Sequence, residues 1–221
     1  MTEIKIFESI FKANENLAAE NASFFEKNNI FAINLMASPG SGKTSFILET
    51  ASRIADRFKT AVIEGDIASQ VDTEKVRARG IESVQINTGG ACHLEANMIK
   101  KALEHLNLKG VDLLIIENVG NLVCPADFNL GESARVVILS VPEGDDKPHK
   151  YPSIFRDCSV LIVNKIDMLE LCDFSMEKLK DVVHRLNPGV KIIPLSCRTG
   201  HGFNVWVDWL EEQLKSRRPN G

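Results

Sequence analysis

The stretch "ASPGSGKTS", residues 37–45, constrains the fold of this chain more than any other feature. It follows the apolar run "IFAINLM" and precedes the helical pattern "TSFILETASRIADRF". Gly40 and Gly42 allow the backbone to curl, so that successive N–H groups point inward at a phosphate chain. The helix that follows adds the positive end of its dipole. A strand, a glycine-rich turn and a helix in this order predict a phosphate-binding loop.

The end of this stretch matches the pattern G-x-x-x-x-G-K-[ST], the P-loop of nucleotide-binding proteins. Ala37 stands where the pattern has its first glycine, so the match is imperfect. We expect Lys43 to pair with the β- and γ-phosphates and the Thr44 hydroxyl to bind Mg²⁺. The residues predicted to contact the nucleotide here are Gly40, Ser41, Gly42, Lys43, Thr44 and Ser45.

The rest of the chain alternates between short apolar runs and amphipathic helical patterns. The further apolar runs, rich in Ile and Val, are "TAVIEG", "SVQIN", "VDLLIIEN", "ARVVILSV", "CSVLIVNK" and "VKIIPLS". Short continuous runs of this kind suit strands that are buried on both faces of a parallel sheet. The alternation predicts an α/β protein with the P-loop NTPase fold, a mostly parallel sheet with helices on both faces.

A length of 221 residues suits one large domain, and no linker, repeat or sharp change of composition divides it. We expect an N-terminal helical extension over residues 1–29, in which Ile4, Phe7, Ile10 and Phe11 share one side. The P-loop domain is expected over 30–216, followed by a short tail over 217–221.

Charge and cysteine content indicate where the protein works. The chain has 26 Lys and Arg residues against 30 Asp and Glu residues, which argues against a nucleic-acid partner. Its first residues contain no uninterrupted apolar run, so neither a signal peptide nor a membrane span is expected. Five cysteines, an odd number at irregular spacing, indicate reduced thiols. We therefore predict a cytoplasmic protein.

A second motif indicates which base is bound. Asn164, Lys165 and Asp167 form N-K-x-D at the end of the run "LIVNK", where open α/β sheets bind ligands. A carboxylate there can accept the ring N1–H and the 2-amino protons of guanine, whereas adenine would leave it unpaired. The loop "SCRTG" after the last strand resembles the loop that lies against guanine in GTPases. Its predicted base-contacting residues are Ser196, Cys197 and Arg198.

Acidic residues at other strand ends complete the predicted reaction site. Asp66 lies just past the second run and Glu117 past the fourth, where carboxylates near Thr44 can hold Mg²⁺ directly or through water. Asp72 is a weaker candidate for positioning the attacking water. Lys43, Asp66 and Asp72 are thus the predicted catalytic residues, with a surface role as the alternative for the carboxylates.

The stretch "NTGGACHLEA" places Cys92 and His93 side by side after two glycines. A thiolate and an imidazole together suit zinc, nickel or copper(I). Two ligands alone hold a metal poorly, so either further ligands exist elsewhere or the pair is accidental.

The order of these motifs resembles the HypB family, the nickel-incorporation GTPases of [NiFe]-hydrogenase maturation. The stretches that carry the resemblance are "SPGSGKT", "EGDIAS", "NTGGACHLEA", "IIENVGNLVCP", "VPEGDDKPHKYP" and "NKIDML". The resemblance implies GTP and GDP as nucleotides, slow hydrolysis to GDP and phosphate, and a GTP-dependent homodimer. It also implies nickel or zinc bound by Cys92, His93 and Cys124 near the subunit interface. The implied partners are a small nickel or zinc metallochaperone and the hydrogenase large-subunit precursor.

The spacing of the cysteines adds a physical reason to that likeness. Cys124 follows Glu117 by seven residues, so its loop and the loop of Cys92 should leave the same edge of the sheet as the nucleotide. Two thiolates per chain, doubled by a two-fold axis, would give four ligands. We expect His93 to matter less, because its adjacency to Cys92 should strain joint binding.

This sequence also departs from parts of the family pattern. It lacks the N-terminal cysteine motif and the histidine run of some members, which favours a separate nickel donor. Ser38 stands where related dimeric ATPases place a lysine that reaches the partner subunit. Lys147 or Lys150 could supply such a contact, with a solvated loop as the alternative.

Three other functions remain open at this point, one of them a pure metal-binding protein without turnover. The urease accessory GTPase is similar, although it typically has Cys-Pro-His where this chain has Ala-Cys-His. A small-molecule kinase would use the same P-loop but has little use for N-K-x-D.

Overall fold

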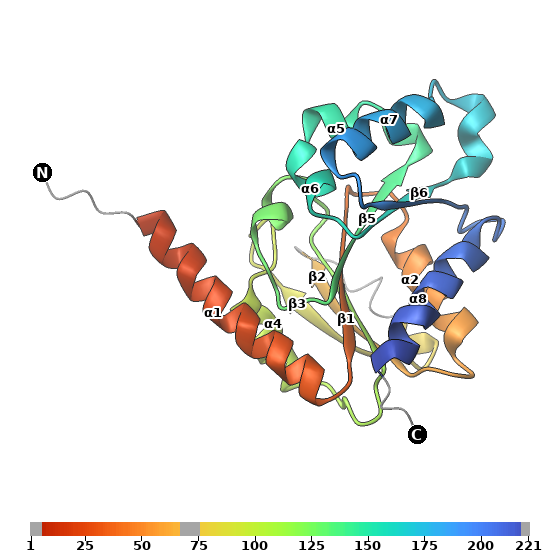
Figure 1. The fold of residues 1–221 in the computed structure, drawn as a ribbon. Coiled ribbons are helices and arrows are strands. Elements are labelled where there is room, and N and C mark those ends of the chain that lie inside the picture. Colours follow the sequence, from red (N-terminus) through yellow and green to blue (C-terminus); the bar gives the residue numbers. More distant parts are fainter. Residues whose placement is uncertain (1–5, 67–75, 218–221) are drawn as a thin grey trace, which may run out of the picture.

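A computed structural model describes residues 6–66 and 76–217 of the chain (Figure 1). Its centre is a parallel sheet of seven strands in the order β3-β2-β4-β1-β5-β6-β7. The strands are β1 (Phe31–Ala37), β2 (Thr60–Asp66), β3 (Glu82–Asn87), β4 (Leu113–Glu117), β5 (Ala134–Ser140), β6 (Val160–Asn164) and β7 (Lys191–Pro194). Each strand lies within or overlaps one of the apolar runs, so the prediction of an α/β sheet is confirmed. The sheet is parallel at every pairing between described strands.

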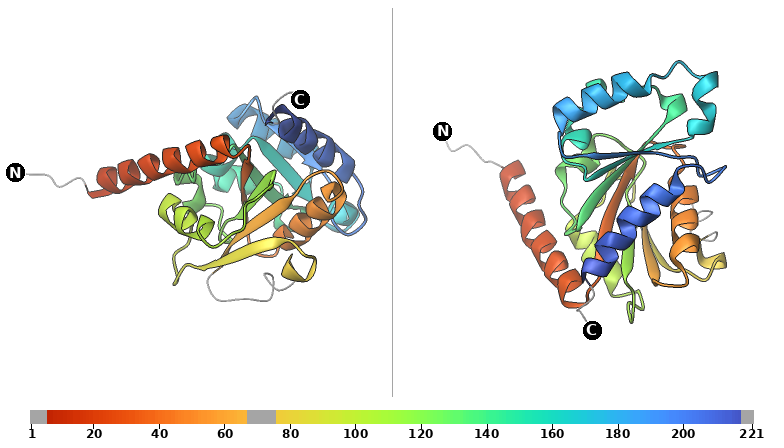
Figure 2. Two further views of the ribbon diagram at one scale, coloured as in Figure 1. Left: turned by 90° about the horizontal axis from the view of Figure 1, so that it is seen from below. Right: turned by 45° about the vertical axis from the view of Figure 1, so that its right-hand side comes forward.

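Helices cover both faces of the sheet, as predicted (Figures 1 and 2). The α-helices are α1 (Ile6–Lys27), α2 (Lys43–Ile54), α4 (Ala96–Leu103), α5 (Lys147–Lys150), α6 (Pro152–Arg156), α7 (Met176–Leu186) and α8 (Phe203–Arg217). Three short 3₁₀ helices are η1 (Cys124–Asp127), η2 (Val141–Glu143) and η3 (Ile166–Leu171). No helix in the described ranges is both long enough and apolar enough to cross a bilayer.

The core explains why the strands read as unbroken apolar runs. Every residue of β1, β4 and β6 is buried, because helices pack on each side of these central strands. Helices α2 and α8 share one apolar cluster with β1, in which Trp206 is fully buried and donates to Thr50 at 3.0 Å. On the other face, α1 and α4 pack against β1 and β2, and α6 and α7 against β5 and β6. All strands therefore present their carboxyl ends at one edge.

Helix α1 packs on the body of the domain through buried amides. Asn21 donates to the carbonyls of Ala96 and Leu130 at 2.9 and 3.1 Å, and Asn14 accepts from the Ala96 N–H at 2.9 Å. At Gly131, a Cβ atom would lie 2.5 Å from a carbonyl of α1, so only glycine permits this approach. The first turns of α1 extend beyond the body (Figure 1), while its second half shares the core of the sheet.

Candidate functional site

The P-loop connects β1 to α2, as its position after the first apolar run predicts. Gly40 and Gly42 have φ angles of 76° and 101°, and Gly42 is the N-cap of α2. Both angles lie in the left-handed region that favours glycine. A Cβ atom at Gly42 would also lie 2.5 Å from the side-chain nitrogen of Asn164. The second glycine of the motif is therefore required by backbone conformation and by lack of space.

The N-K-x-D motif joins the P-loop directly. Asn164 lies at the end of β6. Its side-chain nitrogen donates to the Ser41 carbonyl at 2.9 Å, and its side-chain oxygen accepts from the Cys197 N–H at 3.2 Å. Lys165 takes a φ of 61° and donates to the Gly40 carbonyl at 2.7 Å. The two sequence motifs and the "SCRTG" loop thus form one continuous site.

Asp167 is held with its carboxylate ionised. Ser196 Oγ donates to one carboxylate oxygen at 2.6 Å, and Arg198 Nε lies 3.0 Å from the other. The hydrogen bond from Ser196 and the nearby charge of Arg198 hold the pKa of Asp167 below its usual value. A cavity of about 500 Å³ opens beside this carboxylate, lined also by Ser45, Met168 and Cys197 among others. Burial raises the pKa of the Cys197 thiol to about 12, so that it is a neutral packing group there.

The carboxylates predicted for Mg²⁺ lie at strand ends near the P-loop. Glu117 is buried at the end of β4 and pairs in register with Leu35 of β1, two residues before the P-loop begins. Thr44 lies in the first turn of α2. Asp66 ends β2, the strand on the other side of β4, but its side chain is outside the described part of the structure. Asp72 lies entirely outside the described residues.

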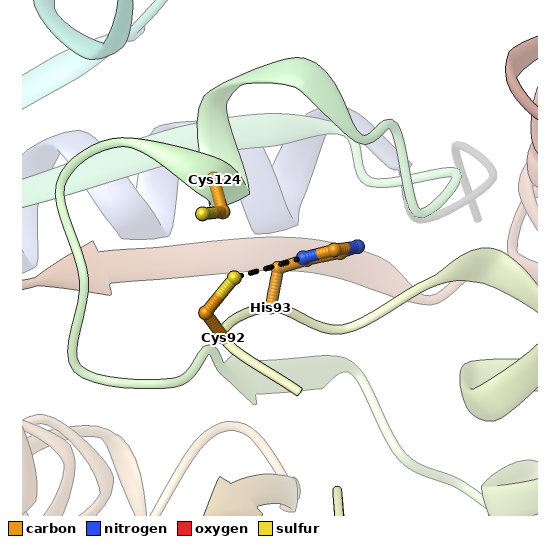
Figure 3. Close-up of side chains that lie close together, drawn as sticks. All are labelled: Cys92, His93 and Cys124. Carbon is orange, nitrogen blue, oxygen red and sulfur yellow. Dashed lines mark hydrogen bonds between the residues drawn. The ribbon is translucent and has the colours of Figure 1, made fainter. Parts of the chain in front are cut away.

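Cys92, His93 and Cys124 come together in space, as Figure 3 shows. One potential ligand atom of each lies within 4.8 Å of the other two, and Cys92 Sγ is 3.6 Å from His93 Nδ1. Bonds of about 2.3 Å to sulfur and about 2.0 Å to nitrogen place neighbouring donors of a tetrahedral ion about 3.5 Å apart. The donor set and its spacing therefore fit a single soft or borderline metal ion.

The positions of the two donor atoms bear on the strain expected between adjacent ligands, which itself stays a prediction. Side chains of neighbouring residues point to opposite faces within a strand. Cys92 and His93 instead lie in the bend between β3 and α4, where the Cys92 thiol points toward Cys124 at the start of η1 and His93 Nδ1 is directed at that thiol. The adjacency of Cys92 and His93 does not keep their donor atoms apart.

Asn118, which the sequence did not single out, connects the metal-binding loops to the centre of the sheet. It follows β4, is fully buried, and accepts from the Leu94 N–H at 3.1 Å, just after His93. Its amide donates at 3.1 Å to Asn34 on β1. A single buried Asn directly after a strand produces no periodic pattern, so the sequence could not indicate this role.

The loop that carries Cys124 also contacts both the P-loop and the Cys92 loop. A Cβ atom at Gly120 would lie 3.0 Å from the ring of Pro39, so the two loops pack without a gap. Asn121 donates to the Cys92 carbonyl at 3.3 Å. The nucleotide-binding and metal-binding loops are therefore in direct contact at the carboxyl edge of the sheet.

The thiols differ in their environments. A hydrogen bond with Cys124, followed by burial and the charge of Cys124, raises the pKa of Cys92. Cys158 is buried two residues before β6, and burial raises its pKa to about 12. Cys172 is only partly buried and packs against the cluster under α7. Cys158 is a core residue, as its position before an apolar strand predicted.

Lys147 and Lys150 lie in α5, which the sequence did not indicate. Lys150 forms an ion pair with Asp146 at 2.5 Å, and the Lys147 ammonium lies 5.8 Å from the centre of the Tyr151 ring. Both lysines thus have local contacts within their own chain. A contact with a partner subunit stays a prediction.

Comparison with known proteins places the chain in a family. Residues 31–194 match the family described as "CobW/HypB/UreG, nucleotide-binding domain". The chain is 44% identical over 214 residues to the hydrogenase maturation factor HypB of Azotobacter chroococcum, covering 97% of this chain and 70% of the relative. It is 39% identical over 212 residues to the probable hydrogenase maturation factor HypB of Methanocaldococcus jannaschii, covering 96% of each.

Solved structures agree with this placement. HypB from Helicobacter pylori in complex with nickel aligns with a TM-score of 0.87 and 39% identity, covering 94% of this chain and 98% of that one. HypB from Archaeoglobus fulgidus aligns with a TM-score of 0.86 and 42% identity, covering 92% and 99%. A LAO/AO transport system kinase, at 12% identity and a TM-score of 0.54, shares the fold alone. The chain belongs to the CobW/HypB/UreG family of P-loop proteins and, within it, to the HypB hydrogenase maturation factors.

Proposed function

We propose that this chain is a GTP-hydrolysing metallochaperone that delivers nickel during [NiFe]-hydrogenase maturation. One observation carries the proposal: Cys92, His93 and Cys124 converge where two loops meet, and the loop that leads to Cys124 touches the P-loop. A change at the γ-phosphate can therefore alter the positions of the metal ligands. The nickel complex of the Helicobacter pylori HypB supports nickel as the cargo.

The nucleotide in this proposal is GTP or GDP with Mg²⁺. Gly40 to Ser45 surround the phosphates, and Lys43 balances the charge that develops during hydrolysis. Asp167 accepts from guanine in the cavity beside it, with Asn164, Lys165 and the loop of Ser196, Cys197 and Arg198 around it. Thr44, Asp66 and Glu117 hold Mg²⁺, and Asp72 positions the attacking water.

The proposed partners follow from the same assignment. GTP favours a homodimer, in which two-fold symmetry brings a second set of thiols to the metal. A small nickel or zinc metallochaperone supplies the ion, and the hydrogenase large-subunit precursor receives it. The five cysteines, free among the described residues, fit a reducing cytoplasm.

The alternatives have weaker support. A relative at 41% identity from Helicobacter pylori is called a hydrogenase/urease maturation factor, so service to urease is the nearest alternative. Delivery of nickel to a hydrogenase precursor but not to a urease precursor would separate them. A small-molecule kinase has no need for the Asp167 carboxylate at the base cavity.

The proposal is tested by metal titration of the purified protein with GDP and with a non-hydrolysable GTP analogue. Thiolate-to-nickel charge-transfer absorbance and molecular mass are followed together. We expect tighter nickel binding and a larger dimer fraction with the GTP analogue. Identical nickel affinity and mass in both nucleotide states would contradict coupling between the two sites.

Substitution of Asp167 by alanine is expected to weaken binding of GTP and GDP by at least about tenfold, because the guanine donors lose their acceptor. The unmutated protein should bind GTP much more tightly than ATP. Calorimetric titration measures both, and equal affinities for GTP and ATP would remove the guanine assignment.

The Asp167→Asn variant supplies a matched control across pH. Protonation of the GDP phosphates affects binding to both proteins equally. The ratio of the two GDP affinities therefore reports only the contribution of the Asp167 carboxylate. Because the pKa of Asp167 is lowered in the folded protein, the ratio of affinities should stay constant as the pH falls to about 5. It should decline only below the ordinary pKa of Asp, about 3.9. A decline beginning near neutral pH would show that the carboxylate is not held ionised.

A further inference from the structure

The imidazole of His93 lies against three other side chains, those of Cys92, Glu95 and Phe128. Its Nδ1 faces Cys92 Sγ at 3.6 Å, and its Nε2 lies 3.6 Å from Glu95 Oε1. The Phe128 ring stacks on it with centroids 3.8 Å apart and planes inclined by 22°. Figure 3 shows Nδ1 directed at Cys92 and the other ring nitrogen pointing away from the cysteine pair.

These contacts distinguish the two ring nitrogens. A metal bound among Cys92, Cys124 and His93 reaches Nδ1, because that nitrogen faces the thiols. A histidine that binds metal through one nitrogen carries its proton on the other, and a carboxylate commonly accepts that proton. Nε2 is buried and makes no hydrogen bond to any described residue, so the Glu95 carboxylate is the acceptor at hand.

Glu95 is available for this contact. It is the N-cap residue of α4, but its side chain makes no capping hydrogen bond, and it is about one-third exposed. A shift of a few tenths of an ångström would bring the carboxylate within hydrogen-bond distance of Nε2.

Phe128 is held by the segments that meet at the metal site. It directly follows η1, the short helix that begins with Cys124. Its ring also lies 5.3 Å, centroid to centroid, from that of Phe11 in α1. The stack on His93 therefore connects the Cys124 segment and the N-terminal helix with the Cys92 loop.

We propose that Glu95 and Phe128 are positioning residues that make His93 a third ligand through Nδ1. Phe128 fixes the plane of the ring, and Glu95 fixes the proton on Nε2. This inference rests on the proposed function, because it takes the cluster to be the site of the transported ion.

The first test is NMR of histidine side-chain nitrogens in the unmutated protein, without metal and loaded with zinc, which is diamagnetic. The His93 signals are identified by their loss in His93→Gln. We expect the proton on Nε2 in both states and zinc on Nδ1. Zinc on Nε2, or a His93 signal unchanged by zinc, would overturn the assignment.

The second test is zinc affinity, measured in competition with a chromophoric chelator. Glu95→Ala and Phe128→Leu should each weaken zinc binding by about ten- to a hundredfold, the usual effect of removing a group that orients a ligand. Glu95→Gln and Phe128→Tyr should recover part of the loss, since they keep an acceptor and a ring. Glu104→Ala, which removes an exposed carboxylate just beyond α4, is the matched control and should change nothing.

The same substitutions in a His93→Ala background separate positioning from general damage. There, Glu95→Ala and Phe128→Leu should have no further effect on zinc affinity, because their target is gone. An undiminished effect would overturn the positioning roles. Loss of zinc binding in Cys92→Ala and Cys124→Ala, with none in the Glu95 and Phe128 variants, would reject this inference alone. Intact binding in the cysteine variants would reject the proposed metal site itself.

Discussion

Replacing Lys43 by alanine is expected to abolish measurable GTP hydrolysis, a loss of about a thousandfold or more. Lys43 is the first residue of α2. Its ammonium lies 3.4 Å from the Ser38 carbonyl, inside the loop that curves around the phosphates. The other lysine bonded to this loop, Lys165, donates to Gly40 from the base side. No described lysine is placed to replace the lost charge at the γ-phosphate.

Phosphate release under saturating GTP measures this effect. Lys101→Ala removes an exposed lysine from α4 and serves as the matched control, with hydrolysis expected to stay at the unmutated level. The Lys43→Ala protein should keep its unfolding temperature, because this side chain contributes little to the core. Hydrolysis at the unmutated rate in Lys43→Ala would mean that the loop does not act as a P-loop.

Cys92→Ala and Cys124→Ala are each expected to remove most nickel binding near pH 7.5. Both thiols belong to the cluster, and each substitution leaves only one thiolate per chain for an ion that favours several. Basal GTP hydrolysis should stay within a few-fold, since neither thiol contacts the P-loop motif itself. Hydrogenase activation in cells should be lost in both variants.

Equilibrium dialysis with nickel, with and without a non-hydrolysable GTP analogue, measures this loss. Cys172→Ala is the matched control, because Cys172 is also a partly buried thiol but packs under α7. Full nickel binding by a monomeric, nucleotide-free Cys124→Ala protein would contradict a site shared between subunits. Cys124 would then be a structural thiol at the start of η1.

The sheet could be predicted from the sequence because its signals are local. Each central strand is buried on both faces, and this produces a continuous apolar run such as 31–37 or 160–164. The P-loop and N-K-x-D were likewise visible, since each is a contiguous motif with a fixed chemical purpose. The short helices α5 and α6 were missed, because "KPHK" and "PSIFR" are too short to show a helical period.

The contacts that organise the site could not be predicted, because they join distant parts of the chain. Asn118 reaches Asn34 across 84 residues, and Asn14 reaches Ala96 across 82. The stack of Phe128 on His93 depends on the path of two loops that no periodic pattern describes. The approach of His93 Nδ1 to Cys92 Sγ at 3.6 Å likewise depends on the bend between β3 and α4, which no sequence pattern indicated.

The fit of Asn164 against Gly42 has a consequence for the synthesis of the chain. Asn164 donates to the Ser41 carbonyl across 123 residues, so the phosphate loop and the base-binding motif complete each other. At a translation rate of about 5–20 residues per second, roughly 6–25 seconds separate the emergence of the two. Both thiols of the metal cluster emerge within that interval, before Asn164 is available to the glycine turn. Guanine-specific loading must therefore wait until the segment that contains Asp167 has emerged.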